Sequence, residues 1–332
     1  MANFRPSRPI ALLTLLAAAI GGCSSSRRGH DGAAPAAEPE VTQYLDDART
    51  MREAGRDDEA LALLARAIEE NPTLAVAHVQ MGEIYREKGE YTQAERSYAR
   101  AATVEPANFD AQYGHGLVLH LLDRLSDAVR AYLRALSIRP DDFAANLNVA
   151  TAYLQLDGPP QALPYARRAV ELNPASGPAH ANLGAVYSAM NRHAEAIVEY
   201  EAASELMDLT PALLLNLAES LGQERRYEEM VNTLTAAIRL EPSAPAWERL
   251  GFAAFKLRRY DQALSAFAES TRLDPNHYPA LNGTGVVLLN QYILGGKVDD
   301  ALRRQATSDL RASLRINPRQ PRIVELVSRF GR

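Results

Sequence analysis

The sequence repeats itself every 34 residues, and this period restricts the chain to a small set of folds. Small residues mark one position of the period, alanines mark a second and prolines mark a third: Gly82, Gly116, Ala150, Gly184 and Ala218; Ala60, Ala94, Ala128, Ala162 and Ala196; Pro72, Pro106, Pro140 and Pro174. Within residues 177–210, small and aromatic residues recur at helical spacing in two blocks, with Asn191 and Arg192 between them. Each period therefore predicts two helices joined by a turn. One such pair cannot bury both of its helices, so the period predicts a stacked array.

The residues that mark the period resemble those of the tetratricopeptide repeat family. Trp247, Leu250 and Gly251 match the opening of its consensus, and its tyrosine slot holds Tyr85, Tyr153 and Tyr187. Its second half is matched by Ala94, Tyr98, Ala101 and Pro106, by Ala128, Tyr132, Ala135 and Pro140, and by Ala263, Phe267, Ser270 and Pro275. The resemblance implies an all-α, right-handed solenoid of about eight helix-turn-helix repeats with a C-terminal capping helix.

We expect eight repeats and one capping helix, at residues 41–74, 75–108, 109–142, 143–176, 177–210, 211–243, 244–277, 278–320 and 321–332. The last repeat departs from the pattern, because Gly285 and Ala306 lie 21 residues apart where the other repeats have 12. Nine residues are therefore inserted around Asn290 to Lys297, and Gly295-Gly296 indicates a loop there. Such a loop could be a lid, a partner contact or a neutral bulge.

The first 40 residues have a different composition from the repeats. Arg5 and Arg8 precede an apolar run from Ile10 to Ile20, which is too short to span a bilayer and predicts a signal peptide over residues 1–22. Ile20-Gly21-Gly22-Cys23 resembles a bacterial lipobox, which implies lipidation of Cys23; Ser24 after it implies an outer-membrane lipoprotein that faces the periplasm. An ordinary signal peptide with an incidental cysteine is the alternative. Residues 23–40 have few bulky apolar side chains, so we expect a disordered tether.

Charge and motifs argue against several classes of function. The net charge is −5, and it becomes −7 once residues 1–22 are removed, which argues against nucleic acid as a partner. The segment 297–332 is an exception, with nine basic and four acidic residues, and its simplest interpretation is a solvated face. No Gly-x-Ser-x-Gly or His-Glu-x-x-His motif occurs. We therefore expect a protein that is not an enzyme and that has no metal, no cofactor and no small-molecule substrate.

Three asparagines indicate a peptide-binding surface. Asn148, Asn182 and Asn216 are 34 residues apart, so in a stacked array they would form a row on the first helices, which by family resemblance line the concave groove. A carboxamide donates and accepts hydrogen bonds, as the backbone of an extended peptide requires. A neighbouring slot holds Tyr113, Leu147 and Leu215, which could anchor apolar side chains of that peptide. The alternatives are that the asparagines only follow the family consensus and that the apolar residues only pack helices.

The sequence thus predicts a non-enzymatic, periplasm-facing interaction scaffold, held at the membrane by its N-terminal lipid, that binds extended segments of other proteins. Two alternatives stay open. One is an assembly factor similar to the tetratricopeptide pilotin lipoproteins, which help a type IV pilus or secretion secretin to form. The other is a docking subunit for a periplasmic peptidoglycan hydrolase or protease.

Overall fold

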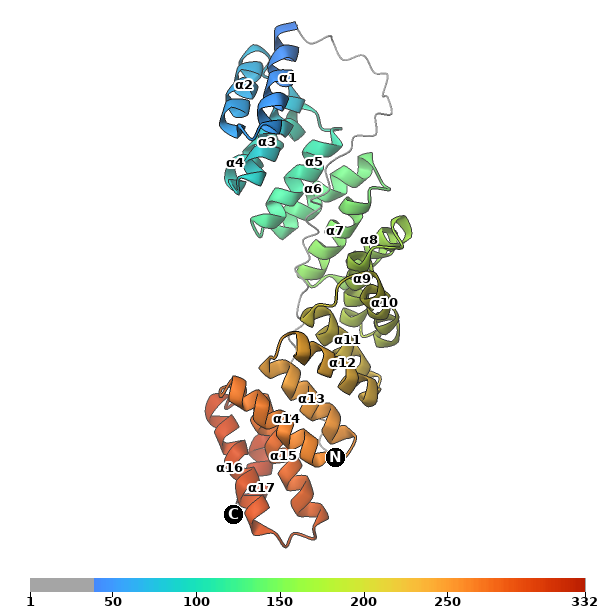
Figure 1. Cartoon of the computed structure of the whole chain (residues 1–332), viewed down its shortest axis with the longest axis vertical. Helices are drawn as coiled ribbons and strands as arrows, with labels where there is room; N and C mark the ends of the chain where they lie inside the picture. Colours follow the sequence, from blue (N-terminus) through green and yellow to red (C-terminus); the bar gives the residue numbers. More distant parts are fainter. Residues whose placement is uncertain (1–38, 332) are drawn as a thin grey trace. The chain divides into compact units, whose positions relative to one another are not determined.

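The computed structural model describes residues 39–331, and all of its regular structure in that range is helical (Figure 1). Seventeen helices follow one another as consecutive helix-turn-helix pairs, so the all-α prediction is confirmed. The expected signal peptide, Cys23 and most of the expected tether lie outside the described residues. Helix α1 includes Pro39 and Glu40, the last two residues of the expected tether, and the boundary of the tether stays a prediction.

The described chain divides into two compact units, with the boundary after Val186, inside helix α9. The N-terminal unit contains α1 (Pro39–Glu53), α2 (Asp57–Glu70), α3 (Ala75–Glu87), α4 (Tyr91–Val104), α5 (Phe109–Leu121), α6 (Leu125–Ile138), α7 (Phe143–Gln155), α8 (Pro159–Leu172) and most of α9 (Gly177–Ala189). Each expected repeat in this range holds one helix pair.

The C-terminal unit continues with α10 (His193–Leu206), α11 (Pro211–Gln223), α12 (Tyr227–Leu240), α13 (Ala244–Lys256), α14 (Tyr260–Leu273), α15 (Tyr278–Leu294), α16 (Asp300–Ile316) and α17 (Pro321–Phe330). Up to α14 the first helix of each pair after α1–α2 has 13 residues and the second has 14. None of the helices within residues 39–331 combines the length and the apolar character needed to cross a membrane.

The turn inside each pair is set by one residue in the left-handed region. This residue has φ between 56° and 76° and recurs with the period: Gly55, Gly89, Asp123, Asp157, Asn191, Arg225 and Arg258. Such a residue ends a helix by turning the chain out of the α-conformation. Several helix starts are capped by a side chain, as at Asp142, which accepts a hydrogen bond from the Ala145 amide, and at Asp299, which accepts from Ala301 and Leu302.

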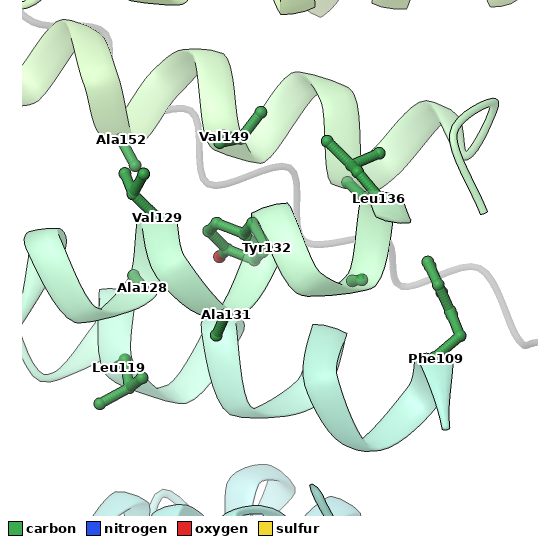
Figure 2. Close-up of a cluster of buried hydrophobic side chains, with 11 residues drawn as sticks. Phe109, Leu119, Ala128, Val129, Ala131, Tyr132, Leu136, Val149 and Ala152 are labelled. Atoms are coloured by element: carbon green, nitrogen blue, oxygen red, sulfur yellow. The ribbon is translucent and has the colours of Figure 1, made fainter. Parts of the chain in front are cut away.

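The core of each pair is completed by the next pair. Figure 2 shows Tyr132 of α6 between the helices that carry Leu119 and Val149, that is α5 and α7. Tyr132 is fully buried, together with Ala128 of its own helix. Since α5 and α6 form one pair and α7 begins the next, this cluster holds two successive pairs together.

Glycines allow the helices to approach these buried aromatic rings. A Cβ atom at Gly82 of α3 would lie 2.9 Å from the ring of Tyr98, and one at Gly114 of α5 would overlap the other side of the same ring. The Tyr98 ring on α4 therefore packs between Gly82 of its own helix pair and Gly114 of the next helix pair. The Phe267 ring packs in the same way between Gly251 and Gly283. Close approach, rather than backbone freedom, therefore requires glycine at these positions.

The insertion in the last repeat lengthens its helices. Both α15 and α16 have 17 residues, so Asn290 to Leu294 are helical and the expected loop shrinks to residues 295–299. Gly296 and Lys297 have positive φ in this loop. The loop includes Gly295-Gly296, the pair that indicated it in the sequence. The two helices pack well along their length, with Leu289 and Leu310 buried in one cluster. Ile323 of α17 joins the same cluster and covers the end of the pair.

Candidate functional site

Polar side chains connect the first helices of successive pairs in the N-terminal unit. These helices contact one another directly, α3 with α5 and α5 with α7. Asn148 Nδ2 on α7 donates a hydrogen bond to Tyr113 Oη on α5 (2.9 Å), and Asn182 Nδ2 on α9 donates to Thr151 Oγ1 on α7 (2.8 Å). The two donors are 34 residues apart, and their bonds form a short ladder of hydrogen bonds between first helices.

His120 contributes a further bond to this ladder. Its Nε2 lies 2.8 Å from Gln155 Oε1, and its Nδ1 lies 3.5 Å from Tyr132 Oη. Burial lowers the pKa of His120, so the ring is neutral at neutral pH. The neutral ring can donate from Nε2 to the Gln155 oxygen while Nδ1 accepts from the tyrosine hydroxyl.

The three predicted asparagines differ in their surroundings. Asn148 is 2% exposed and Asn216 is 8% exposed, whereas Asn182 is half-buried. The Asn148 amide is already engaged by Tyr113, and Asn182 Oδ1 has no hydrogen-bond partner among residues 39–331. Of the two asparagines in the N-terminal unit, only Asn182 has a buried Oδ1 without a partner among residues 39–331. The peptide-binding role of the row stays a prediction.

The predicted apolar anchors lie mainly among packing residues. Leu147 is buried in a cluster with Ala169 and Ala179. Tyr113 is half-buried and stacks on Phe109, with ring centroids 5.6 Å apart. Leu215 is half-buried. Helix packing thus accounts for Leu147, and the anchoring role stays a prediction for all three.

On α13, in the C-terminal unit, the asparagine slot is taken by an arginine. Arg249 of α13 is buried, its Nε lies 3.7 Å from Glu219 Oε2 on α11, and it donates to the Leu215 carbonyl oxygen at 3.3 Å. It therefore links α13 to α11, as the asparagines link their helices. The sequence carries a signal for this residue, because Arg249 follows Asn216 by the shortened 33-residue period.

Glu248, directly before Arg249, is the most unusual charged group of the described chain. It is 3% exposed and its Oε1 has no hydrogen-bond partner among the described residues. Burial raises its pKa to about 7, while Arg249 lowers it and Glu219 raises it further. An ionised carboxylate there would lack the hydrogen bonds that water provides, so the neutral acid is favoured.

Helix α15, the first helix of the last pair, is hydrogen-bonded to Gln320, the residue directly before the capping helix α17. Asn282 Nδ2 donates to Gln320 Oε1 at 2.7 Å, and Gln320 in turn donates to Ser313 Oγ and to the Asn317 carbonyl. Asn282 Oδ1 has no partner within residues 39–331. In the same range no three His, Cys, Asp or Glu side chains converge in a way that could hold a metal ion.

Family models described as tetratricopeptide repeat match residues 79–143 and 147–211, 211–243 and 244–277, which together exceed half of the 332 residues. The chain belongs to the tetratricopeptide repeat family. Proteins of this family are generally non-enzymatic scaffolds that bind other proteins or peptides. No curated protein matches the sequence significantly.

Solved structures of tetratricopeptide repeat proteins share this fold. The Cut9-Hcn1 hetero-tetramer of the APC/C is similar with a TM-score of 0.52 and 20% identity, over 86% of this chain and 55% of that chain. The chain thus spans about half the length of that relative. YrrB, a tetratricopeptide repeat protein with an unusual peptide-binding site, is similar with a TM-score of 0.50 and 22% identity, over 59% of this chain and 97% of that one. Pseudomonas aeruginosa pilF gives a TM-score of 0.53 and 19% identity, over 63% and 96%. At these identities the similarity concerns the fold alone.

Proposed function

We propose that this tetratricopeptide repeat protein is a non-enzymatic scaffold that binds an extended segment of a partner protein along its first helices. The observation that carries the proposal is the Asn182 carboxamide, whose Nδ2 is held by Thr151 while its Oδ1 has no partner within residues 39–331. The residue is half-buried, so part of Asn182 is accessible to a partner.

An extended peptide supplies the missing donor. Leaving a buried acceptor unsatisfied costs about 1–3 kcal/mol, and a backbone N–H is a donor that every residue except proline provides. The Thr151 bond fixes the orientation of the carboxamide before the partner arrives, which lowers the entropy cost of binding. The fold shared with YrrB supports the proposal, because a peptide-binding site is described for that protein.

The test uses short extended peptides selected for binding to the whole protein, each compared with a version N-methylated at single backbone positions. We expect one N-methylation to weaken binding by roughly three- to tenfold, the contribution of one hydrogen bond. Asn182→Ala should give a similar loss and should remove the sensitivity to N-methylation. Asn148→Ala is the matched control, since Asn148 occupies the same slot one repeat earlier and its Oδ1 is not among the buried acceptors without a partner. Equal losses in both variants, with no effect of N-methylation, would contradict the proposal.

We further propose that the scaffold is an outer-membrane lipoprotein facing the periplasm, held by a lipid on Cys23. The support is the sequence pattern around Cys23. Cys23→Ser should move the protein from the membrane fraction to the soluble fraction, and continued sedimentation with membranes would count against lipidation. Crosslinking in the native envelope then separates the alternatives: secretin subunits favour an assembly factor, and a hydrolase or protease favours a docking subunit.

A further inference from the structure

The N-terminal unit also has a pocket, whose lining residues are not those of the hydrogen-bond ladder. A shallow, open pocket of about 300 Å³ lies between helices α2, α3 and α4. Its apolar lining includes Ile68 and Met81, and its polar lining comprises His78, Arg96, Ser97 and Arg100. The pocket therefore combines an apolar wall with two guanidinium groups.

Neither arginine has an acidic partner within residues 39–331. Arg96 and Arg100 make no ion pair and no hydrogen bond there, and both are exposed. The two are four residues apart on α4, so they lie on the same face of the helix and repel each other. The electrostatic field of Arg100 also reaches into the pocket, since it helps burial to lower the pKa of His78.

The arginines at the same two positions one period later both have partners within the protein. Arg130, which corresponds to Arg96, pairs with Asp127, and Arg134, which corresponds to Arg100, donates to Gln112 Oε1 at 2.8 Å. The corresponding positions of the second repeat hold Gln93 and His78 in place of Asp127 and Gln112. The side chains that accept from Arg130 and Arg134 are therefore replaced by other residue types at the corresponding positions of the second repeat.

An anion would supply the missing acceptors. A guanidinium group binds carboxylate and phosphate through two parallel hydrogen bonds, and such charge-assisted bonds are stronger than neutral ones. An inorganic anion would leave Ile68 and Met81 uncovered, whereas a ligand that also carries an apolar body would bury them. We propose that this pocket binds a carboxylate or phosphate group borne on an apolar body, with Arg96 and Arg100 as its anchors.

The test measures binding of four small probes to the full protein by calorimetry. Octanoate and octyl phosphate combine the two features, octanol lacks the charge, and acetate lacks the apolar body. We expect saturable binding of octanoate, octyl phosphate or both, with octanol and acetate at least about tenfold weaker. The comparison of the first two probes identifies which anion the pocket prefers.

Variants assign the binding to the two arginines. The double variant Arg96→Gln with Arg100→Gln should lose at least about tenfold in affinity, and melting should be unchanged because both side chains are exposed. Arg130→Gln is the matched control and should bind as the natural protein does. A second readout is the His78 ring resonance, whose pKa should rise when an anion binds and not with octanol. The proposal is overturned if octanol binds as tightly as octanoate, if Arg130→Gln loses as much affinity as the double variant, or if neither anion binds saturably.

Discussion

Replacing Glu248 by glutamine tests how a buried acid contributes to the stability of this array. The folded-state pKa of Glu248 is about 7, above the ordinary value of 4.5 that applies to the unfolded chain. Between these values the folded protein binds more protons than the unfolded chain, so the stability of the natural protein falls as the pH rises through this window. Above pH 7 the full cost of burying the carboxylate is present.

The size of the effect follows from the two pKa values. A difference of about 2.5 units at 1.36 kcal/mol per unit gives about 3 kcal/mol at pH 8.5 and almost nothing near pH 4.5. Glutamine has nearly the same shape and no charge. Glu248→Gln should therefore raise the free energy of unfolding by about 3 kcal/mol at pH 8.5 and change it little at pH 4.5.

The neighbouring residue provides the assay. Trp247 is the only tryptophan of the chain and lies next to Glu248 on α13, so its fluorescence reports unfolding of this region even where the array does not unfold in one step. Urea titrations at pH 4.5 and 8.5 give the two free energies. Glu241→Gln, on an exposed side chain of the same unit, is the control and should change neither. A gain for Glu248→Gln that is the same at both pH values would refute the reasoning.

Three further substitutions test the fold. Gly82→Ala should cost about 1–3 kcal/mol in a thermal melt, because its Cβ would lie 2.9 Å from the Tyr98 ring. Arg258→Gly should stabilise the protein by roughly 0.5–1 kcal/mol in urea unfolding, since Arg258 has φ of 60° and glycine adopts this region without strain; a loss of stability would contradict this. Tyr113→Phe should cost about 1 kcal/mol by removing the acceptor of Asn148, and a double-mutant cycle with Asn148→Ala should show coupling; additive losses would argue against the bond.

The fold was predictable because one physical requirement recurs in every repeat. Glycine and alanine at fixed spacing let helices approach, and large side chains such as Tyr132 fill the space between pairs, so the period itself specified the helix pairs. The last repeat was less predictable. Nine extra residues fit either a long loop or two longer helices, and the choice depended on whether the added turns found apolar partners, as Leu289 and Leu310 did.

The candidate site was harder to predict from the sequence than the fold. Spacing placed Asn148 and Asn182 in one slot, but it could not show that Tyr113 and Thr151 on the preceding helices engage their amides. Whether a carboxamide is free depends on residues about one period away. The residues of a single slot do not contain that information. Glu248 was missed for a related reason: its charge suggests an exposed residue, and only the packing of neighbouring helices shows that it is buried.

The packing of Tyr98 between Gly82 and Gly114 limits where this protein can be shortened. A fragment that stops after α4 keeps Gly82 on one side of the Tyr98 ring and loses Gly114 on the other. The ring would then be exposed to water, which promotes aggregation. A usable fragment needs a polar residue in place of the aromatic on its final second helix, or else the α17 segment transplanted onto the new end. The number of repeats in such an array is therefore easier to change by removing whole pairs from the middle than by trimming from the C-terminus.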